Sequence, residues 1–502
     1  MFRDLFRGQG VCEAPSDPRA LGRRAFFGTI ALSAVSSGRL ALQMLVLPVI
    51  ARLLGPEDYG LVSLAMPFIL FANLLSDAGM GAALVRRADP SPALESTVFW
   101  LCVMIGLGIA VCVSLLAAPA SWLFHEPRVA PLMLALCPIL VLSSCLSVAN
   151  ARISRARHFA LFAIGDLISV SLSSGAAILA ALHGWGPWSL VVQQLTLWLA
   201  KATWVLGASR FRPRLTCDLA LAKGLLSFGL NNVGANVADF TGKSAPALVI
   251  GALLGVMAVG RFSMATQLIR IPDLVFSGPF YLATFAAVSR LSGAEAGKTS
   301  ARALRMVVSV LAPIFCGLGV VADLVVRLFL GPRWQGAAET LAILAPGGIF
   351  VGFYSVASAV LMGLGRADRQ FRLSLACGVS IFAGALAGAH SSLEGAAAGV
   401  TIGAAIISPF YIAVLASELR ISAARLVADV ARPLAASAIM VCAVLLTRSL
   451  LVGGEAWLQL LASLGAGAAT FVAVLCVTSG RQLVDDVRQT LPTRARERPS
   501  LT

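Results

Sequence analysis

The sequence predicts an all-α polytopic membrane protein with about fourteen transmembrane helices, and three observations predict this fold class. Of the 502 residues, 58% are hydrophobic and only 13% are charged, whereas soluble proteins carry about 25% charged residues. Apolar runs of about 20 residues, the length that crosses a bilayer, follow one another along almost the whole chain. The basic residues gather in every second connection between these runs.

The expected transmembrane segments are separated by short polar connections, so no separate domain outside the membrane is expected. Two of the segments, the seventh and the eighth, have an unusual content of polar residues. The rough bounds, in chain order, are 26–50, 61–85, 96–118, 131–150, 159–182, 186–208, 225–250, 257–285, 303–329, 337–364, 371–389, 393–417, 433–451 and 456–478.

The net charge of +15 is explained by topology rather than by nucleic-acid binding. Cytoplasmic loops of membrane proteins carry an excess of Lys and Arg. With the N-terminus inside, 29 of the 39 basic residues fall in the predicted cytoplasmic tails and loops, 5 fall in the loops on the opposite side, and 5 lie within helices. The distribution therefore predicts that both termini are cytoplasmic.

Two short sequence echoes predict that the chain is built from two similar halves. Leu53-Leu54-Gly55 with Gly60 recurs as Leu253-Leu254-Gly255 with Gly260, and Pro138 with Ser147-Val148-Ala149 recurs as Pro346 with Ser355-Val356-Ala357. Each half then has six helices and starts inside, which predicts two bundles related by a pseudo-two-fold axis normal to the membrane. The expected parts are a cytoplasmic tail (1–25), the first bundle (26–208), a basic cytoplasmic linker (209–224), the second bundle (225–418), two added helices (419–478) and a cytoplasmic tail (479–502).

The sequence offers no catalytic residues, cofactor site or metal site. Thr241-Gly242-Lys243-Ser244 resembles the end of a phosphate-binding loop, but Val237 stands where that motif requires glycine, and no strand precedes it. No spacing of Cys and His suits a metal. Energy for any transport must therefore come from an ion gradient or from the gradient of the substrate.

Charged and polar residues inside apolar segments are the most informative feature, because a charge at a helix centre costs about 2.5–3.5 kcal/mol. Arg39 and Gln43 lie one turn apart on the first segment. They are expected to line a polar cavity, or Arg39 forms a structural pair with an acid such as Asp77. Asp77 precedes a stretch of small residues that allows close helix contact.

The seventh segment carries a polar stripe, because Asn232, Asn236, Asp239 and Lys243 lie at spacings that share one helix face. This face is expected to line a wet cavity; alternatively, Asp239 and Lys243 neutralise each other as an i, i+4 pair. The stripes of the first and seventh segments open their halves, which predicts a pseudo-symmetric cavity with cationic groups. Such a cavity suits an anionic head group, for example a diphosphate.

Three further sets of charges complete the candidates. Arg270 and Asp273 flank Pro272 and either line the cavity or satisfy each other at a kink. Asp166 and Lys201 are lone charges that could pair across helices. The predicted substrate-binding residues are Arg39, Gln43, Asn232, Asn236, Lys243 and Arg270, and the candidates for ion coupling are Asp77, Asp166 and Asp239.

The run Arg52-Leu-Leu-Gly-Pro-Glu-Asp-Tyr-Gly-Leu61, followed by Asp77-Ala-Gly-Met-Gly-Ala-Ala-Leu-Val-Arg-Arg87, resembles the N-terminal signature of Wzx-type polysaccharide flippases. These belong to the multidrug/oligosaccharidyl-lipid/polysaccharide exporter superfamily. The resemblance implies a V-shaped fold with a cationic central cavity and alternating access. It further implies that an undecaprenyl-diphosphate-linked oligosaccharide is moved across the bacterial inner membrane for exopolysaccharide, capsule or O-antigen synthesis. The implied partners are this lipid-linked oligosaccharide, membrane lipids and polysaccharide polymerase or export machinery, with no nucleic acid.

Three other functions are alternatives to this one. A cation-coupled small-molecule exporter of the same superfamily would favour an acid-rich cavity, whereas cations slightly outnumber acids within these helices. A lipid II flippase is a related alternative, against which the Gly-Pro-Glu-Asp-Tyr-Gly turn favours the polysaccharide branch. A membrane-embedded transferase or polymerase should have a large polar periplasmic loop, and the sequence shows none.

Overall fold

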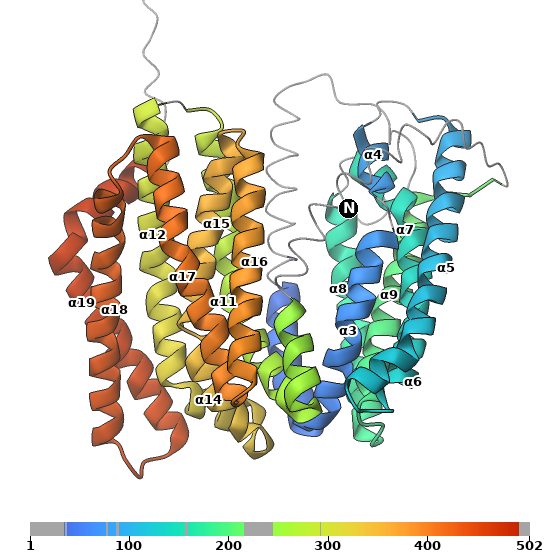
Figure 1. The fold of residues 1–502 in the computed structure, drawn as a ribbon, viewed down its shortest axis with the longest axis horizontal. Coiled ribbons are helices and arrows are strands. Elements are labelled where there is room, and N and C mark those ends of the chain that lie inside the picture. Colours follow the sequence, from blue (N-terminus) through green and yellow to red (C-terminus); the bar gives the residue numbers. More distant parts are fainter. Residues whose placement is uncertain are drawn as a thin grey trace, which may run out of the picture. The chain divides into compact units, whose positions relative to one another are not determined.

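The computed structural model describes residues 35, 38–76, 79–86, 90–155, 159–214, 244–291 and 293–490. Within these ranges every regular element is a helix (Figure 1), which confirms the predicted all-α class. The chain divides into two compact units, Met1–Ser244 with Gly255–Gly260, and Ala245–Leu254 with Arg261–Thr502. The bounds of the six predicted parts stay predictions.

The first unit is a bundle in which α5 packs on α7 and α7 packs on α9. Buried apolar side chains such as Leu94, Val98 and Val148 fill the space between α4, α5 and α7. A helix at 38–53 begins the described chain. It is followed by α3 (Pro56–Ser76), α4 (Met80–Arg86), α5 (Pro92–Leu123), α6 (Val129–Leu136), α7 (Pro138–Arg155), α8 (Phe159–Leu182) and α9 (Trp188–Ser209).

The second unit has its main core between α12 and α15, where Leu311, Phe315 and Val356 are fully buried. A helix of this unit at Ser244–Leu254 precedes α11. The other elements are α11 (Val256–Val288), α12 (Gly293–Val320), α13 (Ala322–Val325), the π-helix η1 (Val326–Leu330), the 3-10 helix η2 (Pro332–Trp334), α14 (Gln335–Leu344), α15 (Gly347–Gly363), α16 (Ala367–Ala389), α17 (Leu393–Leu419), α18 (Ala423–Leu450) and α19 (Ala456–Thr490).

Ten helices among the described residues are long and apolar enough to cross a membrane, and the bent pair α14–α15 makes eleven. Ile402, Ile406 and Phe410 of α17 are more than half exposed. They lie one helical turn apart, as expected for a stripe that faces lipid. The protein is therefore a multi-pass membrane protein. The count of fourteen stays a prediction, because three predicted segments are described only in part and α9 is not among the ten.

The predicted segment 61–85 is wrong at both ends. The helix starts earlier, at Pro56, because proline suits the first helical position and the acids Glu57 and Asp58 favour a helix N-terminus. It stops at Ser76, and the chain resumes as α4 after Gly79, whose φ of 66° lies in the left-handed region. The connection between the predicted segments 26–50 and 61–85 is therefore shorter than predicted, because the chain is helical up to Leu53 and again from Pro56.

The two echoed prolines lie at helix breaks. Pro138 begins α7 directly after α6, and Pro346 precedes α15 where the span bends by 49°. Proline lacks the N–H that would continue the helical bonding pattern. The sixth predicted segment of each half also ends in the same way. Arg210, directly after α9, has a φ of 48°, and Arg420, directly after α17, has a φ of 53°. Local features thus recur in order, while the two-fold axis itself stays a prediction.

Helices α16 and α17 pack through facing glycines. A Cβ at Gly384 would overlap the carbonyl of Gly399, and a Cβ at Gly388 would overlap the carbonyl of Gly395. Small residues at four-residue spacing allow helix backbones to approach closely in membranes. The two helices therefore lie closely side by side within the second unit (Figure 1).

Candidate functional site

Asp166 joins three helices of the first unit through its two carboxylate oxygens. Its Oδ1 lies 2.9 Å from Nζ of Lys201 on α9. Its Oδ2 lies 3.6 Å from a guanidinium nitrogen of Arg39 on the helix at 38–53. We call these residues the Asp166 cluster. Because two cations share one acid, the cluster has a net positive charge. The expected pairing of Asp166 with Lys201 is confirmed, and Arg39 contacts the same carboxylate.

Close packing of α8 against α9 sets the position of Asp166. The neighbouring Gly165 faces Trp204, and a Cβ at Gly165 would overlap the indole ring. The indole Nε1 of Trp204 donates a hydrogen bond to the carbonyl of Leu161, at 3.0 Å. A larger residue at position 165 would push α9 away and separate Lys201 from Asp166.

The Asp166 cluster is accessible rather than sealed in the bundle. Side chains of Arg39, Asp166 and Lys201 retain 39%, 31% and 30% of their exposure. The ammonium of Lys201 also lies 5.9 Å from the centre of the Trp198 ring, which favours the cation at this place. A partly exposed positive cluster on apolar helices is able to meet an anionic group, and a guanidinium matches the geometry of phosphate oxygens.

The structure gives Asp166 the role of an anchor, because both of its oxygens face cations. An acid held in this way fixes the two basic side chains in place. The structure adds no support to ion coupling through Asp166, and that role stays a prediction. Gln43 is exposed one turn beyond Arg39 on the same helix.

Arg270 and Asp273 lie on α11, and no ion pair joins them although both belong to the described part of the chain. Arg270 is exposed, whereas Oδ1 of Asp273 is buried and accepts no hydrogen bond. The interpretation as a self-satisfied pair at Pro272 is therefore wrong. Asp77, Asn232, Asn236, Asp239 and Lys243 lie outside the described residues, and their predicted roles stay predictions.

A second ion-pair cluster, which the sequence did not single out, holds the connection between α5 and α6. Arg128 lies 2.6 Å from Glu57, at the start of α3, and 2.7 Å from Glu126. The hydrogen bond from Arg128 lowers the pKa of Glu126 despite some burial. The hydrogen bonds that Arg128 donates to these two acids raise its own pKa. The sequence Glu126-Pro127-Arg128 indicates a local ion pair between Glu126 and Arg128. The participation of Glu57 could not be predicted, because Glu57 is too distant along the chain.

The two glycines of the first echo lie against each other within the first unit. A Cβ at Gly60 would overlap the carbonyl of Val256, and a Cβ at Gly260 would overlap the carbonyl of Pro56. The contact is reciprocal, because each glycine faces a backbone carbonyl at the start of the other helix. Gly60 and Gly260 occupy equivalent positions of the repeat, and so do Pro56 and Val256. Glycine is needed at both places so that the starts of α3 and α11 can cross closely.

Among the residues that the structure describes, no group of three or more His, Cys, Asp or Glu side chains is placed to hold a metal ion. The candidate site consists of charged side chains held by closely packed helices.

Comparison with known proteins gives several relatives with polysaccharide-related names. The chain is 28% identical over 311 residues to the succinoglycan biosynthesis transport protein ExoT of Rhizobium meliloti (strain 1021), covering 62% of this chain and 63% of the relative. It is 24% identical over 322 residues to the teichuronic acid biosynthesis protein TuaB of Bacillus subtilis (strain 168), covering 62% and 67%. It is 22% identical over 346 residues to the lipopolysaccharide biosynthesis protein WzxC of Escherichia coli (strain K12), covering 67% and 69%. The matched part is thus less than two thirds of the length of ExoT.

Two solved structures share the fold. The lipid II flippase MurJ in an inward closed conformation has a TM-score of 0.76 at 14% identity and covers 91% of this chain and 100% of its own. An inward-facing multidrug resistance MATE family transporter of the MOP superfamily has a TM-score of 0.60 at 16% identity, covering 76% and 94%. These likenesses confirm the predicted fold class.

The family described as polysaccharide biosynthesis protein matches residues 49–339. This match is more than half of the chain, and it includes the whole of the signature, Arg52–Leu61 and Asp77–Arg87. The chain therefore belongs to the polysaccharide biosynthesis protein family.

Proposed function

We propose that this protein is a flippase for a lipid-linked oligosaccharide. Its substrate is an oligosaccharide repeat unit on undecaprenyl diphosphate, and its product is the same molecule in the opposite leaflet. The family, the names of the relatives and the fold of a lipid II flippase support this proposal. No bond is made or broken, so the protein is a transporter rather than an enzyme.

The Asp166 cluster is the observation that carries the proposal. Burying a charge among apolar helices is costly, and retaining two cations for one acid indicates an anionic ligand. The diphosphate of the carrier lipid is the anionic part of such a substrate. We propose that Arg39 and Lys201 contact it, while Asp166 holds both cations in position. Gln43, Asn232, Asn236, Lys243 and Arg270 complete the proposed substrate-binding set, and Asp77, Asp166 and Asp239 remain candidates for ion coupling.

The substrate has two parts with opposite solvation, which sets the mechanism. The polyprenyl tail can stay in the bilayer during transfer, whereas the sugars and the diphosphate need a polar path. We propose alternating access through a cationic central cavity in the bacterial inner membrane, with both termini in the cytoplasm. The substrate is then passed to polysaccharide polymerase and export machinery.

Deleting the gene tests the proposal. We expect a diphosphate-linked oligosaccharide to accumulate on the cytoplasmic face of spheroplasts while surface polysaccharide falls, because synthesis of the lipid continues without transfer. The measurement is extraction and quantification of lipid-linked sugars, with and without an impermeant glycosidase. The intact gene should restore polymer.

Two controls separate this proposal from its alternative. A Lys201→Arg variant keeps the charge and should restore polymer, whereas Arg39→Ala should not despite equal amounts of protein in the membrane. Normal levels of lipid-linked sugars, together with sensitivity to cationic drugs, would contradict the proposal. That outcome would instead indicate a small-molecule exporter, whose fold the MATE structure shares.

A further inference from the structure

The segment at 209–214, which follows α9, is held against the ends of α5 and α7. The backbone N–H of Arg214 donates to Oγ of Ser96, at 3.1 Å. The indole Nε1 of Trp100 donates to the carbonyl of Arg214, at 2.9 Å. Both partners lie in the first turns of α5. The beginning of the predicted linker is thus fixed to the first unit by specific hydrogen bonds.

Phe211 anchors the middle of the 209–214 segment. Its side chain is 8% exposed and belongs to the core cluster of α4, α5 and α7. Its ring centre lies 5.5 Å from that of Phe99, and the guanidinium carbon of Arg152 lies 5.7 Å from it. Because Phe211 is buried, the backbone of Arg210 and Arg212 on either side of it is held in place.

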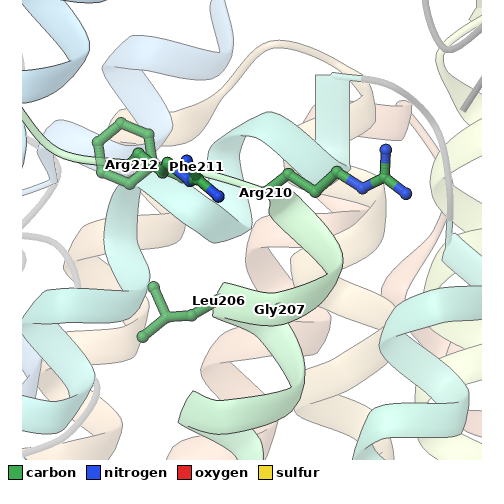
Figure 2. A pocket seen from close by; sticks show the side chains of 5 residues that line it. All are labelled: Leu206, Gly207, Arg210, Phe211 and Arg212. Atoms are coloured by element: carbon green, nitrogen blue, oxygen red, sulfur yellow. The ribbon is translucent and has the colours of Figure 1, made fainter.

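Arg210 and Arg212 line an open cavity of about 570 Å³ together with Leu206, Gly207 and Phe211. Figure 2 shows Leu206 and Gly207 on the end of α9, and the Arg210 side chain extending away from the Phe211 ring. Arg210 and Arg212 are both exposed. Arg210 also has a φ of 48°, a conformation that is uncommon for residues other than glycine. The lining of the cavity therefore includes two arginines together with the apolar side chains of Leu206 and Phe211.

Among the residues that the structure describes, this end of the first unit carries more basic than acidic side chains. Glu95 faces both Arg152 and Arg155, at 3.8 Å and 3.7 Å, so one acid serves two arginines. Arg210, Arg212 and Arg214 add three more cations to the same end. The positive-inside bias explains the sign of this charge. It does not explain a basic cavity whose backbone is clamped to two helices.

We propose that this cavity binds the phosphate group of an anionic membrane lipid. The site lies where α9 ends, at the level expected for lipid head groups. Arg210 and Arg212 contact the phosphate, and the apolar surface of Leu206 and Gly207 lies beside the glycerol and the first methylene groups. Basic pockets at the ends of transmembrane helices are suited to this kind of ligand. The proposal does not depend on what the protein transports.

The test measures lipid binding to the purified full-length protein in a neutral detergent. Native mass spectrometry with added phosphatidylglycerol should give bound lipid, and phosphatidylcholine should give far less. Replacing one arginine, in Arg212→Gln, should weaken binding roughly 5-fold, and Arg210→Gln with Arg212→Gln about 30-fold. Equal binding of phosphatidylglycerol by the double variant would overturn the proposal.

Arg290→Gln is the matched control, because Arg290 is also exposed and lies in a predicted cytoplasmic loop, but outside this cavity. It should bind phosphatidylglycerol as the unchanged protein does, and an equal loss there would overturn the proposal by showing a general charge effect. An unchanged Tm in Arg212→Gln shows that the fold is intact.

Competition identifies the source of the phosphate. Inorganic phosphate should not displace phosphatidylglycerol, and displacement would overturn the assignment to a lipid. Displacement by undecaprenyl diphosphate in the unchanged protein would support the site and assign it to the carrier lipid as well. This readout is separate from export, so its failure leaves the proposed flippase function standing.

Discussion

At the scale of single residues, Asp166 shows which part of the site the sequence can predict. Lys201 was a plausible partner because each residue is a lone charge in neighbouring apolar segments, and an unpaired charge there is costly. The contact of Arg39 with Asp166 was not predicted, because the sequence contains no distances between segments that lie far apart along the chain. The sequence also could not show that Arg270 is exposed and unpaired with Asp273, because a spacing of three residues allows an ion pair without requiring one.

Glu126 and Arg128 give a prediction about acid stability. Arg128 donates to Glu126, which holds the pKa of this carboxyl below its ordinary value in the folded protein. The stability from this pair is thus fully present above the ordinary glutamate pKa of about 4.3 and is lost as the pH falls through the lowered value. Arg128→Gln should lower Tm at neutral pH, and the difference from the unchanged protein should shrink in acid. A difference that grows in acid would contradict this assignment.

At the scale of helices, apolar length predicted the elements well, while local chemistry decided where they begin and break. Helix α5 (Pro92–Leu123) begins before the predicted segment 96–118. Its early start is explained by Ser91, which caps the helix by accepting a hydrogen bond from the N–H of Leu94, at 3.2 Å. A cap of this kind is readable from sequence. The close glycine contacts were not predictable, because their partners come from distant segments.

Gly260 gives a prediction at this scale. In Gly260→Ala the new methyl group would overlap the carbonyl of Pro56, and such overpacking typically costs about 1–3 kcal/mol. We therefore expect a lower Tm for the purified protein. Gly278→Ala is the control on the same helix, since nothing lies within 4 Å of its added Cβ. Its Tm should be unchanged or higher, as alanine favours helix more than glycine. Equal Tm values for both variants would refute the close crossing.

At the scale of the whole molecule, composition and charge placement predicted a multi-pass helical protein, because the bilayer restricts spanning structures so strongly. The placement of ion pairs at the two ends of the first bundle agrees with this multi-pass arrangement. Glu57 and Arg128 meet at one end of the bundle, and Glu95 and Arg155 meet at the other. The substrate could be inferred only from the signature at Arg52–Leu61, since physical chemistry indicates an anion without naming the sugar.

The most direct test of the account is transfer by the purified protein in vesicles. A labelled oligosaccharide on undecaprenyl diphosphate is placed in both leaflets, and its exposure to an impermeant enzyme is followed over time. The unchanged protein and Lys201→Arg should make the inner pool accessible. Lys201→Met should slow transfer by about 10–100-fold, since a lost charged hydrogen bond costs about 1.5–3 kcal/mol. Transfer at the unchanged rate in both Arg39→Ala and Lys201→Met would contradict the claim that the Asp166 cluster binds the diphosphate.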